Sequence, residues 1–481
     1  MVLANPLNTA EQPLYEKVAG EISLLVERGT LRPGERVPSI RKICQQHEVS
    51  MATAMQAYRL LESRGVIEAR PQSGFYVRPQ RWQLPSEPEM TKPRAAATQV
   101  QVGELVMEVV QALRDPALVR LGATLPAPEL FPTLQLNRTM ASAGRRFPVM
   151  ANSYDPAPGN LNLRMQIARR AMESGCSLSP DDIVITCGAT EALNLCLRAV
   201  AKPGDTIAIE SPTFFGILQI IESLGMRACE IPTYPREGIC LVELERRLRS
   251  CAVKAYVFSL NFSNPMGCCM PDDKKRRLVE LLADRNIPLI EDDIYGNITF
   301  GTERPKTAKA YDKKGLVLLC DSFTKTLAPG YRIGWTAPGR FKTKIEFLKY
   351  VNSSGTASLP QMGIADFLAN GSFDHHVRKI RHFYRNQVQL MSEAIGRYFP
   401  KGTRATRPAG GQVLWVELPT SIDSLKLYRS ALQNKISIAP GPLFSPKRRF
   451  RNFIRVSCGN PWNERIEGAI SRLGELMEEM L

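Results

Sequence analysis

Hydrophobic and polar residues at the start of the chain repeat first with a helical period and then with an extended one. Apolar residues recur at helical spacing in three stretches, and Ser39 and Ser50 stand where a serine side chain caps the second and third. The stretches cover about Leu14–Arg28, Ser39–His47 and Ser50–Gly65, and short strand-like runs follow at residues 66–69 and 75–77. The pattern predicts three helices followed by a β-hairpin.

Beyond this region the chain changes character twice. Residues 80–102 are rich in Pro, Gln, Glu, Thr and Ala and show no apolar period, which predicts an interdomain linker. A short amphipathic helix over about residues 104–113 opens a longer region in which strand-like and helical patterns alternate. We therefore expect a small domain over residues 1–79, the linker, and a large domain over residues 103–481.

The large domain contains short apolar runs typical of buried strands, separated by helical segments. The runs cover residues 183–186, 206–210, 255–260, 288–292 and 317–320. Strands that alternate with helices in this way predict an α/β fold with a mainly parallel sheet. Ligands of such sheets bind at the carboxyl ends of the strands, so the polar residues after each run are the candidates for a site.

Composition favours a globular protein of more than one domain over a membrane or secreted one. Of the 481 residues, 44% are hydrophobic and 23% charged, and no apolar run reaches the length of a membrane span. The eleven cysteines are an odd number without regular spacing, so no disulfide framework is expected. The four histidines lack a neighbouring ligand cluster, so no metal site is expected. These features predict a cytoplasmic protein.

The net charge of +16 suggests a polyanionic partner, but the charge is not concentrated in the small domain. Through Val77 the chain holds nine Lys or Arg against eight Asp or Glu. Charge alone therefore does not predict DNA binding there. That prediction rests on the order of the elements and on particular side chains.

Three helices and a hairpin can form either a DNA-binding unit or a small helical bundle without a ligand. In a helix-turn-helix, the start of the second helix lies against base edges, where short polar side chains and arginines reach bases or phosphates. The residues at suitable places are Arg41, Ser50, Thr53 and Arg59, together with Gly74 in the hairpin. Periodicity leaves both alternatives open.

Specific strings in this region favour DNA binding. They are Leu31–Arg41, Val49–Ser50 and Ser73–Val77, in that order. Together they resemble the GntR family of bacterial repressors. The resemblance implies a winged helix-turn-helix that contacts double-stranded operator DNA through Arg41, Ser50 and Thr53. Met51 departs from the family, which often has arginine at this position.

Polar residues follow several predicted strands of the large domain. Residues 188–190 come after the first run and open a helix over residues 191–200, so backbone N–H groups and the helix dipole face an anion. Asp292 and Tyr295 follow the fourth run and Lys325 follows the fifth, so an acid, a phenol and a lysine can converge. Taken singly, Asp292 could instead cap a helix and Lys325 could be a surface amine.

In their order, these residues resemble the site of the fold-type-I pyridoxal-phosphate enzymes, aspartate aminotransferase and its relatives. The resemblance begins near Leu121 and extends to the end of the chain. It implies that Lys325 forms the Schiff base with the cofactor and that Asp292 pairs with the pyridinium nitrogen. Tyr295 and Asn264 would lie beside the 3-oxygen of the cofactor.

The same resemblance assigns the remaining contacts of the cofactor and of a substrate. Phe214 would stack on the ring, where many relatives have tyrosine, and Arg455 would bind the α-carboxylate of a substrate or effector. The cofactor phosphate would be held by Gly188, Ala189, Thr190, Ser322 and Arg332. Tyr154 matches a tyrosine that reaches the phosphate in the partner subunit.

A GntR-like domain joined to an aminotransferase-like domain resembles the MocR subfamily of regulators. This implies a head-to-tail homodimer in which each DNA-binding domain crosses to the other subunit. Pyridoxal phosphate on Lys325, or its adduct with a small-molecule amine or amino acid, would change how operator DNA is held. An active aminotransferase with a DNA-binding appendage is the alternative, because each catalytic position that maps is occupied. A third possibility is an inert scaffold that binds no cofactor.

Overall fold

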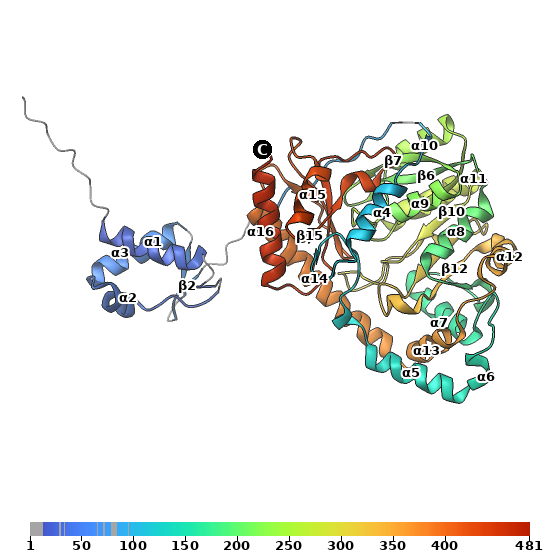
Figure 1. Ribbon diagram of the computed structural model, residues 1–481, viewed down its shortest axis with the longest axis horizontal. Helices are drawn as coiled ribbons and strands as arrows, with labels where there is room; N and C mark the ends of the chain where they lie inside the picture. The colour runs from blue at the N-terminus through green and yellow to red at the C-terminus, as the bar shows by residue number, and fades with distance from the viewer. Residues whose placement is uncertain are drawn as a thin grey trace, which may run out of the picture. The chain divides into compact units, whose positions relative to one another are not determined.

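The computed structural model describes residues 13–27, 30–32, 34–64, 66–70, 73–77, 84–94 and 96–481. The chain divides into two compact units, residues 1–83 and 84–481 (Figure 1). Among the described residues, no helix combines the length and the apolar character needed to cross a membrane.

The first unit contains three helices followed by a β-hairpin, as the sequence predicts. Its elements are α1 (Leu14–Glu27), α2 (Ile40–His47), α3 (Met51–Ser63), β1 (Ile67–Arg70) and β2 (Gly74–Val77). The Oγ atoms of Ser39 and Ser50 each accept a hydrogen bond from the backbone N–H three residues later, at 3.3 and 3.2 Å, so both predicted caps form. The predicted ends of the first and third helices, Arg28 and Gly65, lie outside the described residues.

The helices and the hairpin of the first unit enclose one small apolar core. Tyr58 of α3 is fully buried, and its ring meets Phe75 of the hairpin edge-on with 5.0 Å between centroids. Its hydroxyl donates to the backbone oxygen of Pro38 at 2.5 Å. Ala54 and Leu61, on the same side of α3, are also buried. One face of α3 is therefore held against the core, and the opposite face is exposed.

A mixed sheet of nine strands forms the centre of the described part of the second unit (Figure 1). The strands are β3 (Thr98–Gln99), β5 (Val184–Thr186), β6 (Thr206–Ser211), β7 (Arg227–Tyr234), β8 (Gly238–Ile239), β9 (Val253–Phe258), β10 (Leu289–Asp292), β11 (Val317–Ser322) and β12 (Gly334–Ala337). Their order is β3-β7-β6-β9-β10-β11-β12-β5, with β8 beside β7. From β7 to β11 neighbouring strands are parallel, and the other pairs are antiparallel. The five runs predicted from the sequence are confirmed as β5, β6, β9, β10 and β11.

Helices cover both faces of this sheet. They are α8 (Ala189–Val200), α9 (Phe215–Ser223), α10 (Leu241–Ser250), α11 (Asp272–Asp284) and α12 (Lys342–Ser353). Val257 and Ile290 belong to the same apolar cluster as the buried residues of α8, whereas the adjacent Tyr256 and Leu289 belong to a cluster with α10 and α11. Since successive strand residues point to opposite faces, the central strands are buried on both sides. This double burial explains their continuous apolar runs.

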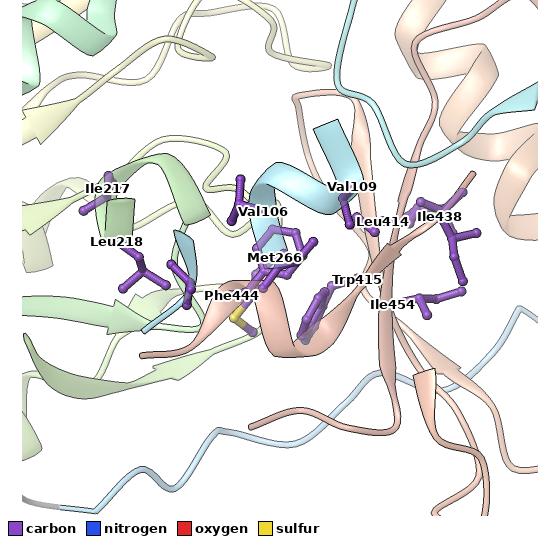
Figure 2. Packing of buried hydrophobic residues seen from close by; sticks show 14 of the residues in the cluster. Val106, Val109, Ile217, Leu218, Met266, Leu414, Trp415, Ile438, Phe444 and Ile454 are labelled. Carbon is purple, nitrogen blue, oxygen red and sulfur yellow. The ribbon is translucent and has the colours of Figure 1, made fainter. Parts of the chain in front are cut away.

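A smaller antiparallel sheet, with α-helices around it, forms the C-terminal part of the second unit. Its elements are β13 (Arg404–Ala405), β14 (Val413–Glu417), β16 (Ala439–Pro440), β17 (Phe453–Ser457), α14 (Ser372–Tyr398), α15 (Ser424–Gln433) and α16 (Glu464–Glu478). Trp415 of β14 is fully buried and stacks on Phe453, with 5.2 Å between ring centroids. Figure 2 shows Val106 and Val109 of α4, the helix Gly103–Ala112, close to β14 and to α9. This helix therefore joins the two sheets through one apolar core.

Three further helices contribute to a third apolar cluster at the side of the sheet that ends in β5. They are α5 (Thr133–Arg146), α7 (Leu161–Ala171) and α13 (Ser358–Ala369), and the short helix α6 (Pro148–Ala151) lies beside α5 and α13. Buried Leu163, Phe367 and Ile185 share this cluster. A short parallel pair, β4 (Val119–Arg120) with β15 (Ile436–Ser437), connects the segment before α5 to the C-terminal part.

The segment predicted as a linker, residues 80–102, is for the most part not a linker in the structure. Its described residues from 84 onward belong to the second unit, and β3 within it pairs with β7 at the edge of the sheet. The Oγ1 of Thr91 donates to the backbone oxygen of Ser211 at 2.7 Å, and the guanidinium of Arg247 donates to the backbone oxygens of Pro93 and Arg94. Since backbone atoms make most of these contacts, the side chains show no apolar period.

Candidate functional site

Loops at the carboxyl ends of β10 and β11 bring three of the predicted residues together. Asp292 ends β10, Tyr295 lies three residues later, and Lys325 lies three residues after the end of β11. The Lys325 Nζ lies 5.8 Å from the centroid of the Tyr295 ring and donates to the backbone oxygen of Thr124 at 2.5 Å. The arrangement places an amine, a phenol and a carboxyl at one edge of the sheet.

Asp292 sits in an environment that disfavours its charge. Its side chain is almost fully buried, and the backbone N–H of Ile294 donates to Oδ1 at 3.3 Å. Burial, together with the neighbouring charge of Asp293, raises the pKa of the Asp292 carboxyl to about 6, although the hydrogen bond from Ile294 and the charge of Lys325 oppose the shift. A cation bound against this carboxyl would favour its ionised form.

The asparagine and arginine predicted for the site contact each other. The Nη1 of Arg455 donates to Oδ1 of Asn264 at 3.1 Å, and its Nη2 donates to the backbone oxygen of Gly122 at 2.5 Å. The Arg455 side chain is fully buried, which lowers the pKa of its guanidinium to about 10. The rings of Phe215 and Phe444 lie 5.8 and 5.1 Å from its Cζ atom, so aromatic faces flank the charge.

Two glycines shape the turn between β5 and α8. Gly188 has φ of +82°, and a Cβ added there would lie 2.6 Å from Nη2 of Arg332. A Cβ on Gly334 of β12 would lie 2.5 Å from the Gly188 carbonyl carbon. The turn thus packs against an arginine with no room for a side chain, and Ala189 begins α8 immediately after it. Backbone N–H groups at this helix start suit a phosphate.

The other predicted phosphate contacts lie around this turn. In the sheet, Ser322 of β11 lies opposite Gly334 of β12, and Gly334 lies opposite Thr186 of β5. Ser322 is therefore two strands away from the end of β5, a separation of about 10 Å. The Nη2 of Arg332 donates to the backbone oxygen of Cys187 at 3.3 Å, and Thr190 is exposed on α8. Arg332 therefore contacts the turn directly, whereas Ser322 lies farther along the same edge of the sheet.

Phe214 and Tyr154 differ in their relation to the site. Phe214 is half-buried at the start of α9, and its ring lies 4.6 Å from that of Phe215, which also flanks Arg455. Tyr154 is 91% exposed, beside a hollow of about 380 Å³ lined in part by Ser353. Within one chain the structure does not join Tyr154 to the lysine and the carboxyl.

Sequence patterns did not reveal a buried charge cluster behind Asp292. The Nη2 of Arg304 donates to Oδ2 of Asp293 at 2.5 Å and lies 4.0 Å from Oδ2 of Asp321. The amide of Asn261 donates to the other oxygen of Asp293 at 2.8 Å. All of these side chains are buried. In the sequence, only the adjacent aspartates at 292 and 293 point to this cluster. An aspartate pair alone does not predict which arginine contacts it.

The predicted DNA contacts lie on the surface of the first unit. Arg41 of α2 and Arg59 of α3 are exposed. The hydroxyls of Ser50 and Thr53 lie 2.8 Å apart at the start of α3, where Ser50 is also the cap. Gly74 has φ of +100° at the start of β2, close to the Arg36 guanidinium.

Comparisons with known proteins match both units. The profile of the bacterial regulatory proteins of the gntR family matches residues 14–77, and that of aminotransferase class I and II matches residues 137–473. The uncharacterized HTH-type transcriptional regulator YdcR of Escherichia coli (strain K12) is 40% identical over 97% of this chain and 99% of its own. The regulator YjiR of the same strain is 37% identical over 96% and 98%. The chain belongs to the MocR-like HTH-type transcriptional regulators.

Solved structures resemble the second unit of this MocR-like regulator. A kynurenine aminotransferase of Pyrococcus horikoshii, solved with PMP, is 30% identical with a TM-score of 0.73, covering 78% of this chain and 95% of that one. LysN, the α-aminoadipate aminotransferase of Thermus thermophilus, solved with N-(5'-phosphopyridoxyl)-L-leucine, is 28% identical with a TM-score of 0.72, covering 78% and 94%. The second unit therefore has the fold-type-I aminotransferase fold, and the family implies pyridoxal phosphate.

Three features of this MocR-like regulator fit that cofactor. The hydroxyl of Tyr295 is buried without a hydrogen-bond partner, which is costly unless a ligand atom completes it. At Gly188 the chain packs against Arg332 where a Cβ would clash, which holds a guanidinium beside the N-terminus of α8, and both groups suit an anion. Asp292 offers a buried carboxyl to a ring cation. The residues present therefore suit a phosphorylated pyridine with an oxygen substituent.

Replacing Asp292 with asparagine should make the cofactor-free protein less sensitive to rising pH. Because the folded-state pKa of about 6 exceeds the ordinary value of 3.8, protonation of Asp292 stabilises the fold at low pH. That stabilisation is complete below about pH 4 and is lost as the pH rises through about 6. Between about pH 5 and pH 7, the wild type should lose about 1 kcal/mol more than Asp292→Asn.

Urea unfolding of both proteins at the two pH values measures this difference. Asp284→Asn, at an exposed position, serves as the control and should follow the wild type. Equal pH dependence of the wild type and Asp292→Asn would contradict the assigned environment of the carboxyl.

Proposed function

We propose that the chain is a pyridoxal-phosphate-dependent transcription regulator whose second unit senses an amine or amino acid and changes how the first unit binds operator DNA. The observation that carries this proposal is the convergence of Lys325, Asp292 and Tyr295 at one edge of the sheet, with Asn264 and Arg455 beside them. A DNA-binding unit joined to such a site couples a small molecule to transcription.

Each residue would have a distinct part in holding the cofactor. Bound pyridoxal phosphate supplies an aldehyde that exchanges between amines and a ring that withdraws electrons. Lys325 would hold it covalently, Asp292 would keep the ring nitrogen protonated, and Tyr295 and Asn264 would donate to its 3-oxygen. Phe214 would stack on the ring. The phosphate would contact Gly188, Ala189, Thr190, Ser322 and Arg332.

An incoming amino acid would meet the same site through its two ends. Its amino group would replace Lys325 as the partner of the cofactor, and its carboxylate would bind the buried fork of Arg455. Release of Lys325 would then change the loop that follows Ser322, the last residue of β11. This coupling would connect the identity of the bound amine to the state of the second unit.

The DNA contacts are proposed on the exposed side of α2 and α3. Arg41, Ser50, Thr53 and Arg59 would contact the major groove and its phosphates, and the hairpin around Gly74 would lie along the neighbouring backbone. Arg41→Ala should weaken operator binding by about 1 to 3 kcal/mol if it contacts a base through two hydrogen bonds.

A gel-shift titration at fixed salt measures the effect of Arg41→Ala. Lys17→Ala removes one positive charge from the exposed surface of α1 and is the matched control. It should change affinity only slightly. An unchanged affinity in Arg41→Ala, or an equal loss in both variants, would contradict the proposed docking.

The proposed assembly is a head-to-tail homodimer in which the first unit crosses to the partner subunit. Exposed apolar side chains gather on α5, α6 and α12, a feature of surfaces that pack against protein. They are Leu134, Val149, Met150, Phe347, Tyr350 and Val351. Tyr154, which is exposed in the single chain, would complete the phosphate site of the partner.

Mixed dimers should reveal a composite site. Tyr154→Phe subunits lose the phenol given to the partner, and Lys325→Ala subunits lose their own covalent attachment. A heterodimer of the two should therefore contain one intact site, with Lys325 from one subunit and Tyr154 from the other, and one site that lacks both groups, and cofactor titration should resolve two affinities, the higher of them equal to that of the wild type. A monomer by light scattering at micromolar concentration with cofactor bound would refute the assembly.

A second candidate function is that of an active aminotransferase with a DNA-binding unit. It is favoured by the presence of Arg455 and of every residue that the mapping assigns to the cofactor. Steady conversion of an amino acid and a 2-oxo acid would support the enzyme. A changed operator affinity on adding amino acid, with at most a half-reaction, would support the regulator. Capture of genomic DNA with and without pyridoxal phosphate supplies the operator for this test.

A further inference from the structure

The exposed face of α3 begins with an apolar strip. Met51 is 60% exposed and Met55 is 39% exposed, although methionine is usually found inside proteins. With Arg59 they form one row at positions i, i+4 and i+8, so they lie above one another along the helix. Ala52, beside this row, is also exposed.

Packing within the first unit does not account for these methionines. The core side of α3 consists of Ala54, Ala57, Tyr58 and Leu61, all fully buried. The methionines lie on the other side of the helix, where nothing in the described part of the first unit covers them. Their side chains are therefore available to a partner of the unit.

The charge around the strip favours a polyanion as that partner. Arg41 and Lys42 of α2 and Arg59 of α3 are exposed, against one exposed acid, Glu48, in the turn before α3, and the first acidic residue within α3 is Glu62, in its last turn. A partner must therefore offer negative charge at the edges and apolar groups in the middle. The DNA major groove has this character: phosphates line it, and the thymine 5-methyl is the apolar group on its floor.

We propose that Met51 and Met55 read thymine methyl groups in each operator half-site. The inference rests on the DNA-binding function proposed above and adds the class of base that α3 recognises. A helix-turn-helix places the N-terminal part of its second helix against base edges, where both methionines lie. Their unbranched, polarisable side chains adapt to a methyl contact. The Ser50 and Thr53 hydroxyls, fixed to each other, begin the same helix.

Deoxyuridine substitution tests the proposal because it removes the methyl and leaves base pairing unchanged. An operator obtained by genomic capture is synthesised with each thymine replaced in turn, and the Kd of the full-length protein is measured at fixed salt. One or two positions per half-site should each weaken binding about fourfold, the effect of removing one methyl from an apolar contact. In Met51→Ala and in Met55→Ala, deoxyuridine at the thymine that the missing methionine contacts should no longer weaken binding.

Controls separate the possible outcomes. Leu14→Ala, at an exposed apolar position of α1, should retain the full deoxyuridine pattern. No sensitive thymine in a specifically bound operator, or the same sensitivity in both methionine variants, would overturn the proposal. So would a loss of dimer stability in those variants with an unchanged pattern, since the strip would then pack on protein. Failure to bind any operator specifically would instead contradict the proposed function, and this inference with it.

Discussion

Lys325→Ala should abolish covalent attachment of pyridoxal phosphate and leave noncovalent binding measurable. The lysine supplies the amine that the aldehyde needs, whereas the proposed phosphate contacts at residues 188–190 and at Ser322 and Arg332 are unchanged. Treatment of the wild type with borohydride should fix the cofactor on the peptide that contains Lys325, and the variant should yield no labelled peptide. The wild type with bound cofactor should also be yellow, and the absorbance maximum of the cofactor should lie at a different wavelength in Lys325→Ala.

A matched control defines the result for Lys325. Lys435→Ala removes an exposed lysine paired with Asp115 and should keep the full label. The response of operator binding to an added amino acid should be lost in Lys325→Ala while the dimer stays intact. A label on another lysine, or none in the wild type, would contradict both the attachment site and the proposed sensing.

Arg304→Leu should destabilise the second unit by about 3 to 5 kcal/mol. The Arg304 guanidinium is buried between the carboxyls of Asp293 and Asp321, and removing one partner of a buried ion pair leaves uncompensated charge. Burial raises the pKa of Asp321 well above its usual range, and the charge of Arg304 opposes that rise. Without the arginine, these carboxyls should bind protons more tightly, so the loss of stability should grow as the pH increases.

Urea unfolding near neutral pH measures this loss. Arg451→Leu breaks an ion pair with Asp423 in which the arginine is 72% exposed, and it should cost about 1 kcal/mol or less. Adding Asp293→Asn to Arg304→Leu should recover part of the stability, because it removes one of the stranded charges. Equal losses in the free energy of unfolding for the two arginine substitutions would show that the buried ion-pair cluster stabilises the fold no more than the pair of Arg451 does.

Local strings in the sequence were sufficient to predict most of the fold and the convergence of the site. Asp292 and Lys325 each follow a continuous apolar run, and such runs are typical of strands that are buried on both faces. Because β10 and β11 pair in parallel, the carboxyl ends of these two strands lie side by side. The caps at Ser39 and Ser50 follow from the serine side chain alone. These features depend on residues close in sequence or on a rule that holds for every parallel sheet.

Other features depend on contacts that no local pattern records. Arg304 meets Asp293 and Asp321 only because β10 pairs with β11, and the described residues from 84 to 102 join the second unit through backbone pairing of β3 and through single side chains such as Thr91 and Val102. Tyr154 shows the opposite limit, since the role in a partner's site that we propose for it would leave its side chain exposed in a single chain, as it is here. Sequence reasoning therefore identifies groups that act together along the chain more readily than those joined by tertiary or quaternary structure.

The two acceptors that Arg455 already has bear on which ligands it can distinguish. Asn264 and Gly122 each accept one hydrogen bond from an Nη atom, whereas Nε is buried without a partner, so an arriving carboxylate can take the remaining N–H groups without displacing either acceptor. A neutral amide of the same shape could take these N–H groups only through its one oxygen. An anion gains more, because hydrogen bonds to a charged acceptor are roughly twice as strong. For the proposed effector, the arginine would therefore select by formal charge and reject amino-acid amides and simple amines.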